Sequence, residues 1–221
     1  MIAKQLENTL GVEYCETEAD MVQRFQLLRE ANLLPRSRGK NAEALIEEQV
    51  VAGLLSIVSA RPGFAAQTVR MLTYLRPVGG PQAGFAGAVT FGEALVKMLR
   101  DAELLKGVLE IRISDSEIYT NSNGRAAVVY RDGDECKETY YVRAECLTLL
   151  QAGAEKTYDP RDLISYIIRE IVVLPGLLIK ISNEIKRDRE HQQLMERPLG
   201  VAPRRSDQTR RHALPSNTDG T

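Results

Sequence analysis

The chain contains few of the residues from which common catalytic sites are built. It has no tryptophan, and only two histidines and three cysteines among its 221 residues. Both histidines, His191 and His212, follow the last strongly apolar segment, so we do not expect either one in a preorganised catalytic triad or zinc site. The sequence also lacks a GxxxxGK[ST] loop, a GxGxxG turn and an HExxH helix. These absences predict a protein that is not an enzyme and that carries no cofactor or metal.

Targeting signals and disulfide patterns are also missing. The three cysteines are far apart and form no CxxC pair, which argues against a disulfide framework. The N-terminal sequence MIAKQLENTLGVEYCETEAD lacks the apolar run of a signal peptide. The most apolar window, residues 163–181, carries Arg169 and Glu170 near its middle, which favours a buried helix over a membrane span. We therefore expect a cytoplasmic protein without a membrane contact.

The charge balance excludes a strong global attraction to polyanions. The chain has 29 basic and 30 acidic residues, and its formal net charge is -1. With 43% hydrophobic and 27% charged residues, the composition is that of an ordinary globular protein. Any preference for nucleic acid must therefore come from local clusters of cations.

Helical signals dominate the first part of the chain. Thr17 can cap a helix that ends near Asn32, and Asn41 can cap a second helix. The pattern FAAQTVRMLTYLR predicts a third helix over residues 64–76, whereas no helix is predicted before Thr17. The Gly- and Pro-rich segment PVGGPQAGFAGAV at 77–89 then indicates a connector between two modules.

Alternating apolar residues follow the connector. The segments VLEIRIS, RAAVVYR and CKETYYV are separated by the turn sequences NSNG and DGDE, which predicts a three-stranded antiparallel meander. A short helix precedes the meander, and a helix over 160–190 with a kink or break at Pro175 follows it. The fold class is therefore α+β. We expect a helical module over residues 1–78, a Gly-rich linker over 79–90, an α+β module over 91–190 and a disordered basic tail over 191–221.

One basic run lies between the first two predicted helices, within ANLLPRSRGKNAEALIEEQVV at 31–51. Cations on such a loop can reach phosphate oxygens, while Gly39 lets the backbone come close and Asn41 opens a helix whose free N–H groups favour anions. The alternative is that these cations pair with Glu43, Glu47 and Glu48 on an ordinary surface. The candidate nucleic-acid-binding residues are Arg29, Arg36, Arg38, Gly39, Lys40 and Asn41.

The order of a helix, LLP, a basic glycine-containing stretch and a second helix resembles MerR-type winged-helix regulators, in which a GLLP turn precedes a basic wing. The matching residues are Asn32–Pro35, Arg36, Arg38–Lys40 and Glu47–Leu55. The stretch also resembles small DNA-binding regulators carried by prophages and integrative elements. The resemblance covers residues 31–55, and it implies a winged-helix-like N-terminal module whose basic loop contacts phosphates but does not read bases.

These features predict a DNA-binding transcriptional regulator of phage or mobile-element origin. A homodimer is expected, because the edges of a three-stranded sheet need cover. The alternative is a non-enzymatic protein-interaction or assembly component with no nucleic-acid role. An enzyme that uses carboxylates or a lone cysteine is a third class. DNA binding requires the loop cations to share a face with other basic residues, such as Arg70 and Arg76.

Replacing Arg36, Arg38 and Lys40 together with alanine is expected to weaken DNA binding. Each lost phosphate contact should reduce the slope of log K against log salt by about 0.9, because fewer counterions are released. Gel shifts over a salt series, with random duplex DNA, measure this slope. Binding of the triple variant that matches the wild type at every salt concentration contradicts the prediction.

Overall fold

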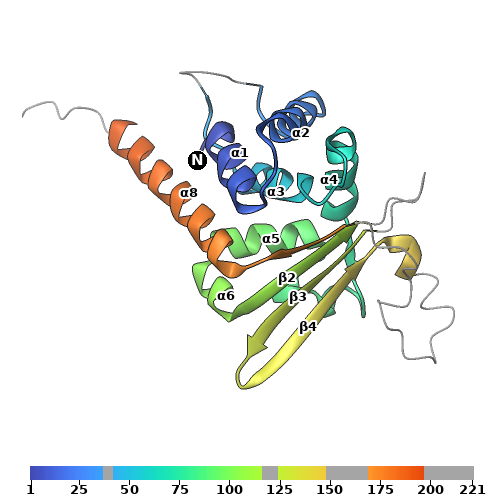
Figure 1. Cartoon of the computed structure of the whole chain (residues 1–221). Helices are drawn as coiled ribbons and strands as arrows, with labels where there is room; N and C mark the ends of the chain where they lie inside the picture. Colours follow the sequence, from blue (N-terminus) through green and yellow to red (C-terminus); the bar gives the residue numbers. More distant parts are fainter. Residues whose placement is uncertain (37–41, 116–123, 148–168, 197–221) are drawn as a thin grey trace, which may run out of the picture.

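A computed structural model of the chain describes residues 1–36, 42–115, 124–147 and 169–196 and shows a layer of helices above an antiparallel sheet (Figure 1). The α+β class expected from the sequence is confirmed. The helices are α1 (Ala3–Glu13), α2 (Glu18–Glu30), α3 (Glu47–Ser56), α4 (Ala65–Thr73), α5 (Phe91–Arg100), α6 (Ala102–Gly107) and α8 (Pro175–Glu196).

Side-chain caps fix where α2, α5 and α6 begin; in α6 the Oδ1 of Asp101 accepts a hydrogen bond from the backbone N–H of Glu103 at 2.9 Å. The Oγ1 of Thr17 accepts a hydrogen bond from the backbone N–H of Asp20 at 3.1 Å, and Thr90 caps α5 in the same way through Glu93 at 3.2 Å. In contrast, α1 has Ile2 at its N-cap position, and this residue makes no side-chain hydrogen bond. The helix was not predicted, because its sequence carries no polar start signal.

The sheet has five strands in the order β1-β4-β3-β2-β5. The predicted meander is confirmed as its three central strands, which are joined by antiparallel pairing. The prediction of only three strands is wrong, because a short strand pairs at each side of the meander. The strands are β1 (Arg76–Pro77), β2 (Val108–Asp115), β3 (Arg125–Asp132), β4 (Glu135–Val142) and β5 (Arg169–Val173).

Strand β5 occupies a segment that was predicted to be helical. Its inward residues, Ile171 and Val173, lie opposite Ile113 and Ile111 of β2 and are buried. The spacing of isoleucines fits a helix as well as a strand over so short a run, and pairing with a distant strand decides between them. The predicted start of that helix, at 159, lies outside the described residues.

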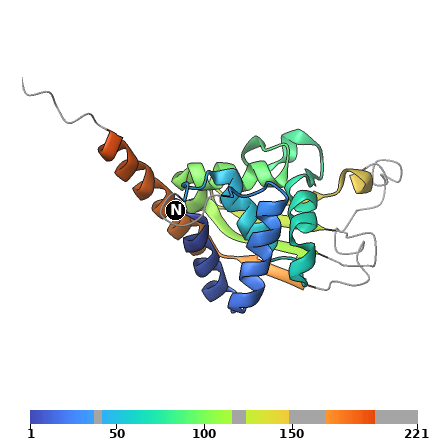
Figure 2. The same ribbon diagram turned by 90° about the horizontal axis from the view of Figure 1, so that it is seen from above.

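Strand β5 ends at Val173 and helix α8 begins at Pro175, so of the predicted kink or break this proline marks a break. The helix continues to Glu196, so the predicted tail boundary at 191 is wrong by one and a half turns. In both views the C-terminal half of α8 extends away from the other elements (Figures 1 and 2). Residues 197–221 of the predicted tail lie outside the described residues.

The predicted linker at 79–90 packs against the sheet. The backbone N–H of Phe85 donates to the hydroxyl of Tyr141 on β4 at 2.8 Å, and the Phe85 ring lies 4.9 Å from the Tyr130 ring on β3. One cluster of buried side chains spans both sides of this segment; it includes Leu6, Phe25, Leu55, Leu95, Ile113 and Leu178. The division into modules at 79–90 stays a prediction about folding units. Among the described residues, none of the helices combines the length and apolarity that crossing a bilayer requires.

Two glycines at the same position of their helices provide a test of this packing. A Cβ at Gly92 of α5 would lie 2.6 Å from Cγ2 and 3.0 Å from the carbonyl oxygen of Thr73, at the end of α4. We expect Gly92→Ala to lower the free energy of unfolding by about 1–3 kcal/mol through overpacking. The matched control is Gly176→Ala in α8, where nothing lies within 4 Å. It should raise stability by up to about 1 kcal/mol in the same urea titration. Equal effects of the two substitutions contradict the described contact between α4 and α5.

Candidate functional site

Helices α1 and α2 form a pair joined by the short turn Tyr14–Thr17. The backbone N–H of Glu16 donates to the carbonyl of Gly11 at 3.0 Å, which closes the end of α1. Cys15 adopts a φ of 53°, a left-handed conformation that lets the chain reverse within the turn. The two helices are in contact. A short turn between two packed helices is the form that αα-hairpins and helix-turn-helix motifs share.

Helix α2 has one buried side and one exposed side. Met21, Phe25 and Leu28 are buried at the spacing i, i+4, i+7, and they pack into the common core. Six residues of α2 face solvent: Glu18, Ala19, Val22, Gln23, Gln26 and Glu30. The helix start at Thr17 and the spacing of these apolar residues together determine which residues of α2 face outward. The two exposed glutamines, Gln23 and Gln26, are therefore functional candidates. The apolar spacing in the sequence indicates their outward position, but the predicted site was drawn mainly from charged residues.

Arg24 of α2, a cation that precedes the basic run, has a structural role. Its side chain is 1% exposed. One guanidinium nitrogen donates to the carbonyl of Ser56 at 2.7 Å, and the other lies 3.5 Å from the carboxylate of Glu16. These contacts hold α2 against the end of α3 and against the α1–α2 turn. Arg24 is therefore not available to a ligand.

Two of the predicted site residues, Arg29 and Arg36, lie together. With Gln26 and Glu30 they line an open depression of about 370 Å³ at the C-terminal end of α2. Arg36 is exposed and donates to Oδ1 of Asn32 at 3.2 Å, while Gln26 donates to Glu30 at 3.0 Å. Within the described part of the chain, the Nε of Arg29 has no hydrogen-bond partner. Both cations are thus placed beside the exposed face of α2.

The loop that carries the basic run is anchored at its base. Leu34 and Leu45 are buried on either side of it. After the loop, the N–H of Leu45 donates to the carbonyl of Met1 at 2.9 Å, and Ala44 forms an antiparallel bridge with Ile2. The remaining predicted site residues, Arg38, Gly39, Lys40 and Asn41, lie outside the described residues.

Arg70 and Arg76, which were expected to share a face with the loop cations if the chain binds DNA, lie in different places. Arg70 of α4 donates to the carbonyl of Ala31 at 3.3 Å, so it adjoins the end of α2. Arg76 of β1 donates to the carbonyl of Val89 at 3.2 Å, at the edge of the sheet. Of these two, only Arg70 adjoins the end of α2, the helix end at which Arg29 and Arg36 lie.

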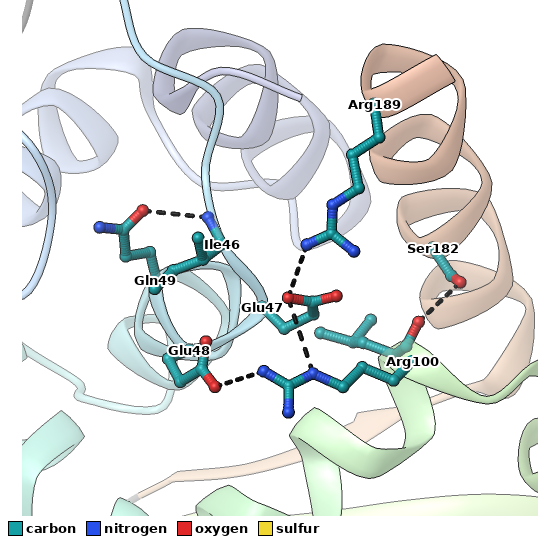
Figure 3. A network of polar contacts seen from close by, with 8 residues as sticks. Ile46, Glu47, Glu48, Gln49, Arg100, Ser182 and Arg189 are labelled. Atoms are coloured by element: carbon teal, nitrogen blue, oxygen red, sulfur yellow. Dashed lines mark hydrogen bonds and ion pairs between the residues drawn. The ribbon is translucent and has the colours of Figure 1, made fainter. Parts of the chain in front are cut away.

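A second polar cluster lies at the start of α3 (Figure 3). Glu47, whose side chain is 4% exposed, accepts a hydrogen bond from Arg189 of α8 at 2.8 Å and lies 3.8 Å from Nε of Arg100. Arg100 also donates to Glu48 at 2.7 Å. Glu47 and Glu48 are thus paired with these two arginines, whereas the alternative sequence interpretation paired them with cations of the loop. The Oγ of Ser182 donates to the carbonyl of Leu99 at 2.8 Å in the same interface.

Enzymatic chemistry would need a metal-binding cluster or an activated nucleophile. In the four described ranges, no group of three His, Cys, Asp or Glu side chains could hold a metal ion. The turn carboxylate of Asp132 pairs with Lys137. Burial raises the pKa of the Cys146 thiol, and this shift opposes the thiolate form that a nucleophile needs. These observations support no reaction.

No family model matches the chain, and no curated protein and no solved structure matches it either. The site at the end of α2 is therefore interpreted from its own residues.

The Glu47 cluster predicts a pH dependence of stability. Burial acts to raise the pKa of Glu47, but the hydrogen bond and charge of Arg189 and the charge of Arg100 outweigh it, so the pKa lies below its usual value. A carboxyl group whose pKa is lowered by folding stabilises the fold at pH values above its pKa in the unfolded chain, about 4.3. This contribution is lost as the pH falls through the pKa of the group in the folded protein.

Glu47→Gln is expected to lower the free energy of unfolding at pH 7 by about 1–3 kcal/mol and to flatten its decline on acidification. Urea titrations between about pH 3 and 7 measure both effects, around the usual glutamate pKa. The control Glu48→Gln changes a carboxylate that is 52% exposed and should follow the wild type within about 0.5 kcal/mol. Identical pH profiles for the two variants are the outcome that contradicts this prediction.

Proposed function

We propose that the chain is a DNA-binding transcriptional regulator that uses α1 and α2 as a helix-turn-helix and places α2 in the major groove. The observation that carries the proposal is the exposed row Ala19, Val22, Gln23 and Gln26, which is uncharged and leads directly to Arg29 and Arg36. A recognition helix needs an outward face of this kind, with base-reading side chains in its middle and cations near the phosphates.

The side chains of this row suit direct base readout. A glutamine amide can form two hydrogen bonds with adenine in the major groove, and the methyl groups of Val22 can contact the thymine methyl group. Gln26 also donates to Glu30, so it must exchange this bond for the bond to a base. The resemblance of residues 31–55 to winged-helix regulators implied phosphate contacts only. The exposed face of α2 adds base reading to the proposal.

Phosphate contacts come from the cations that follow the row. Arg36 is exposed at the base of the anchored loop, and Arg29 lies beside it. Arg38 and Lys40 continue the basic run and are the proposed wing contacts. Glu18 and Glu30 oppose these cations, so the proposal requires a docking in which both carboxylates avoid the phosphates.

The remaining sequence predictions belong to the same proposal. They are a prophage or mobile-element origin, a cytoplasmic location and a homodimer. Strand β5 supports the dimer, because the exposed side chains of Val172 and Leu174 lie at the edge of the sheet. A homodimer would present two copies of α2 to two half-sites.

A second candidate function is a protein-interaction or assembly component. Val12 of α1 is 81% exposed and Val22 of α2 is 42% exposed, so the same helix pair also offers an apolar surface. A protein partner would bury these valines without the strong salt dependence of a phosphate contact. The salt dependence of binding therefore separates the two candidates.

Gln23→Ala combined with Gln26→Ala is expected to remove sequence discrimination. Duplexes selected from a random library by the wild type should bind this variant about 10-fold or more weakly, since each bidentate base contact contributes about 1–3 kcal/mol. Affinity for a scrambled duplex and the salt slope should stay unchanged, because these reflect phosphate contacts. Fluorescence anisotropy with both duplexes gives the two affinities.

The control is Gln82→Ala, which removes an exposed glutamine from the segment that packs on the sheet. It should discriminate as the wild type does. A wild-type protein that shows no salt-dependent duplex binding overturns the proposed function. Discrimination that survives in the double variant overturns the role of α2 as the reading helix.

A further inference from the structure

The outer face of α4 carries no negative charge. From Gln49 to Gly92 the chain contains no aspartate and no glutamate, although 30 of its 221 residues are acidic. Four exposed residues follow one another along this side of the helix at roughly one-turn spacing: Phe64, Gln67, Arg70 and Tyr74. We call them the α4 face. The opposite side of the helix, with Ala65, Val69 and Leu72, is buried.

The α4 face lies beside the proposed reading helix. Helix α2 contacts both α4 and the short 3-10 turn η2 (Pro62–Phe64) that precedes it. Arg70 donates to the carbonyl of Ala31, the residue that ends α2. Seen from above, α2 lies between α1 and α4 in the helical layer (Figure 2). A polyanion that covers the end of α2 therefore meets α4 next.

We propose that the α4 face is a second DNA contact, which binds the phosphate backbone of the duplex flanking the groove that α2 enters. This inference rests on the proposed function and extends it to a surface outside the predicted basic loop. Arg70 uses one guanidinium nitrogen for the bond to Ala31, and an arginine has five N–H donors in all. Gln67 and Tyr74 add an amide and a hydroxyl, both of which commonly donate to phosphate oxygens.

The composition of the face favours the phosphate backbone of a duplex over an apolar protein surface. Phe64 is 44% exposed and Tyr74 is 68% exposed, but a cation and an amide separate the two rings. This arrangement forms no continuous apolar patch of the kind that a protein partner needs. Because the face itself has no carboxylate, a phosphate bound along it meets no repulsion from α4. Glu30 of α2 precedes Ala31, so the phosphate must lie on the side of Arg70 away from that carboxylate.

The test compares wild type, Arg70→Ala and Gln67→Glu on two duplexes that share the selected site. One duplex ends at the boundaries of the selected site, and the other extends about one helical turn (roughly 10 bp) further on each side. On the long duplex, Arg70→Ala should bind roughly 5-fold more weakly, with a salt slope smaller by about 1. On the short duplex, both variants should bind as the wild type does, since the flanking phosphates are absent.

Gln67→Glu guards against a folding artefact. It removes none of the contacts described for α4 and places a carboxylate on the face, so it should weaken binding to the long duplex at an unchanged melting temperature. The charge-matched control is Arg187→Ala, which removes an exposed arginine on α8 and should leave both affinities unchanged.

The outcomes separate this inference from the proposed function. If the wild type binds DNA but Arg70→Ala and Gln67→Glu match Arg187→Ala on both duplexes, the second contact is overturned and the role of α2 stands. If the two variants lose affinity for single strands or anionic vesicles and not for the long duplex, the assignment to duplex DNA is overturned. Absence of duplex binding by the wild type overturns both proposals.

Discussion

The arrangement of the helical layer on the sheet depends on the contacts that the buried carboxylate of Glu47 makes with two arginines. This carboxylate lies at the first turn of α3 and holds Arg189 of α8, and it is close to Arg100 at the end of α5. A carboxylate in this position is costly to bury without partners, and loss of either arginine would leave it poorly compensated. The contact therefore ties the helix that follows the sheet to the helical layer above it.

The path of the chain makes this tie important for the candidate site. Strand β5 runs into α8 with only Leu174 between them, and α8 then runs past α5, α6 and the start of α3. Helix α3 in turn contacts α1, α2 and α4. The position of α2 thus rests on contacts that reach the edge strand of the sheet. A change in how β5 pairs has a continuous packed route to the face that we propose for DNA.

Local signals in the sequence were sufficient for part of this structure. The alternation in VLEIRIS and RAAVVYR predicted the central strands, and the cap at Thr17 set the phase of α2. The elements that were missed depend on distant partners. β5 is a strand because β2 offers it a free edge, and α1 is a helix because Leu6 and Leu10 find a core to enter. Neither partner can be inferred from a local window of residues.

The candidate site shows the same division. The cations Arg29 and Arg36 were evident from local composition, whereas the burial of Arg24 depends on the carbonyl of Ser56, which is far away in sequence. The outward row of α2 contributes almost nothing to the core, because Ala19, Gln23 and Gln26 point away from it. Mutations at these positions can therefore accumulate at little thermodynamic cost. Under the proposed function, a lineage that carries this fold can change its preferred DNA target while its scaffold stays the same.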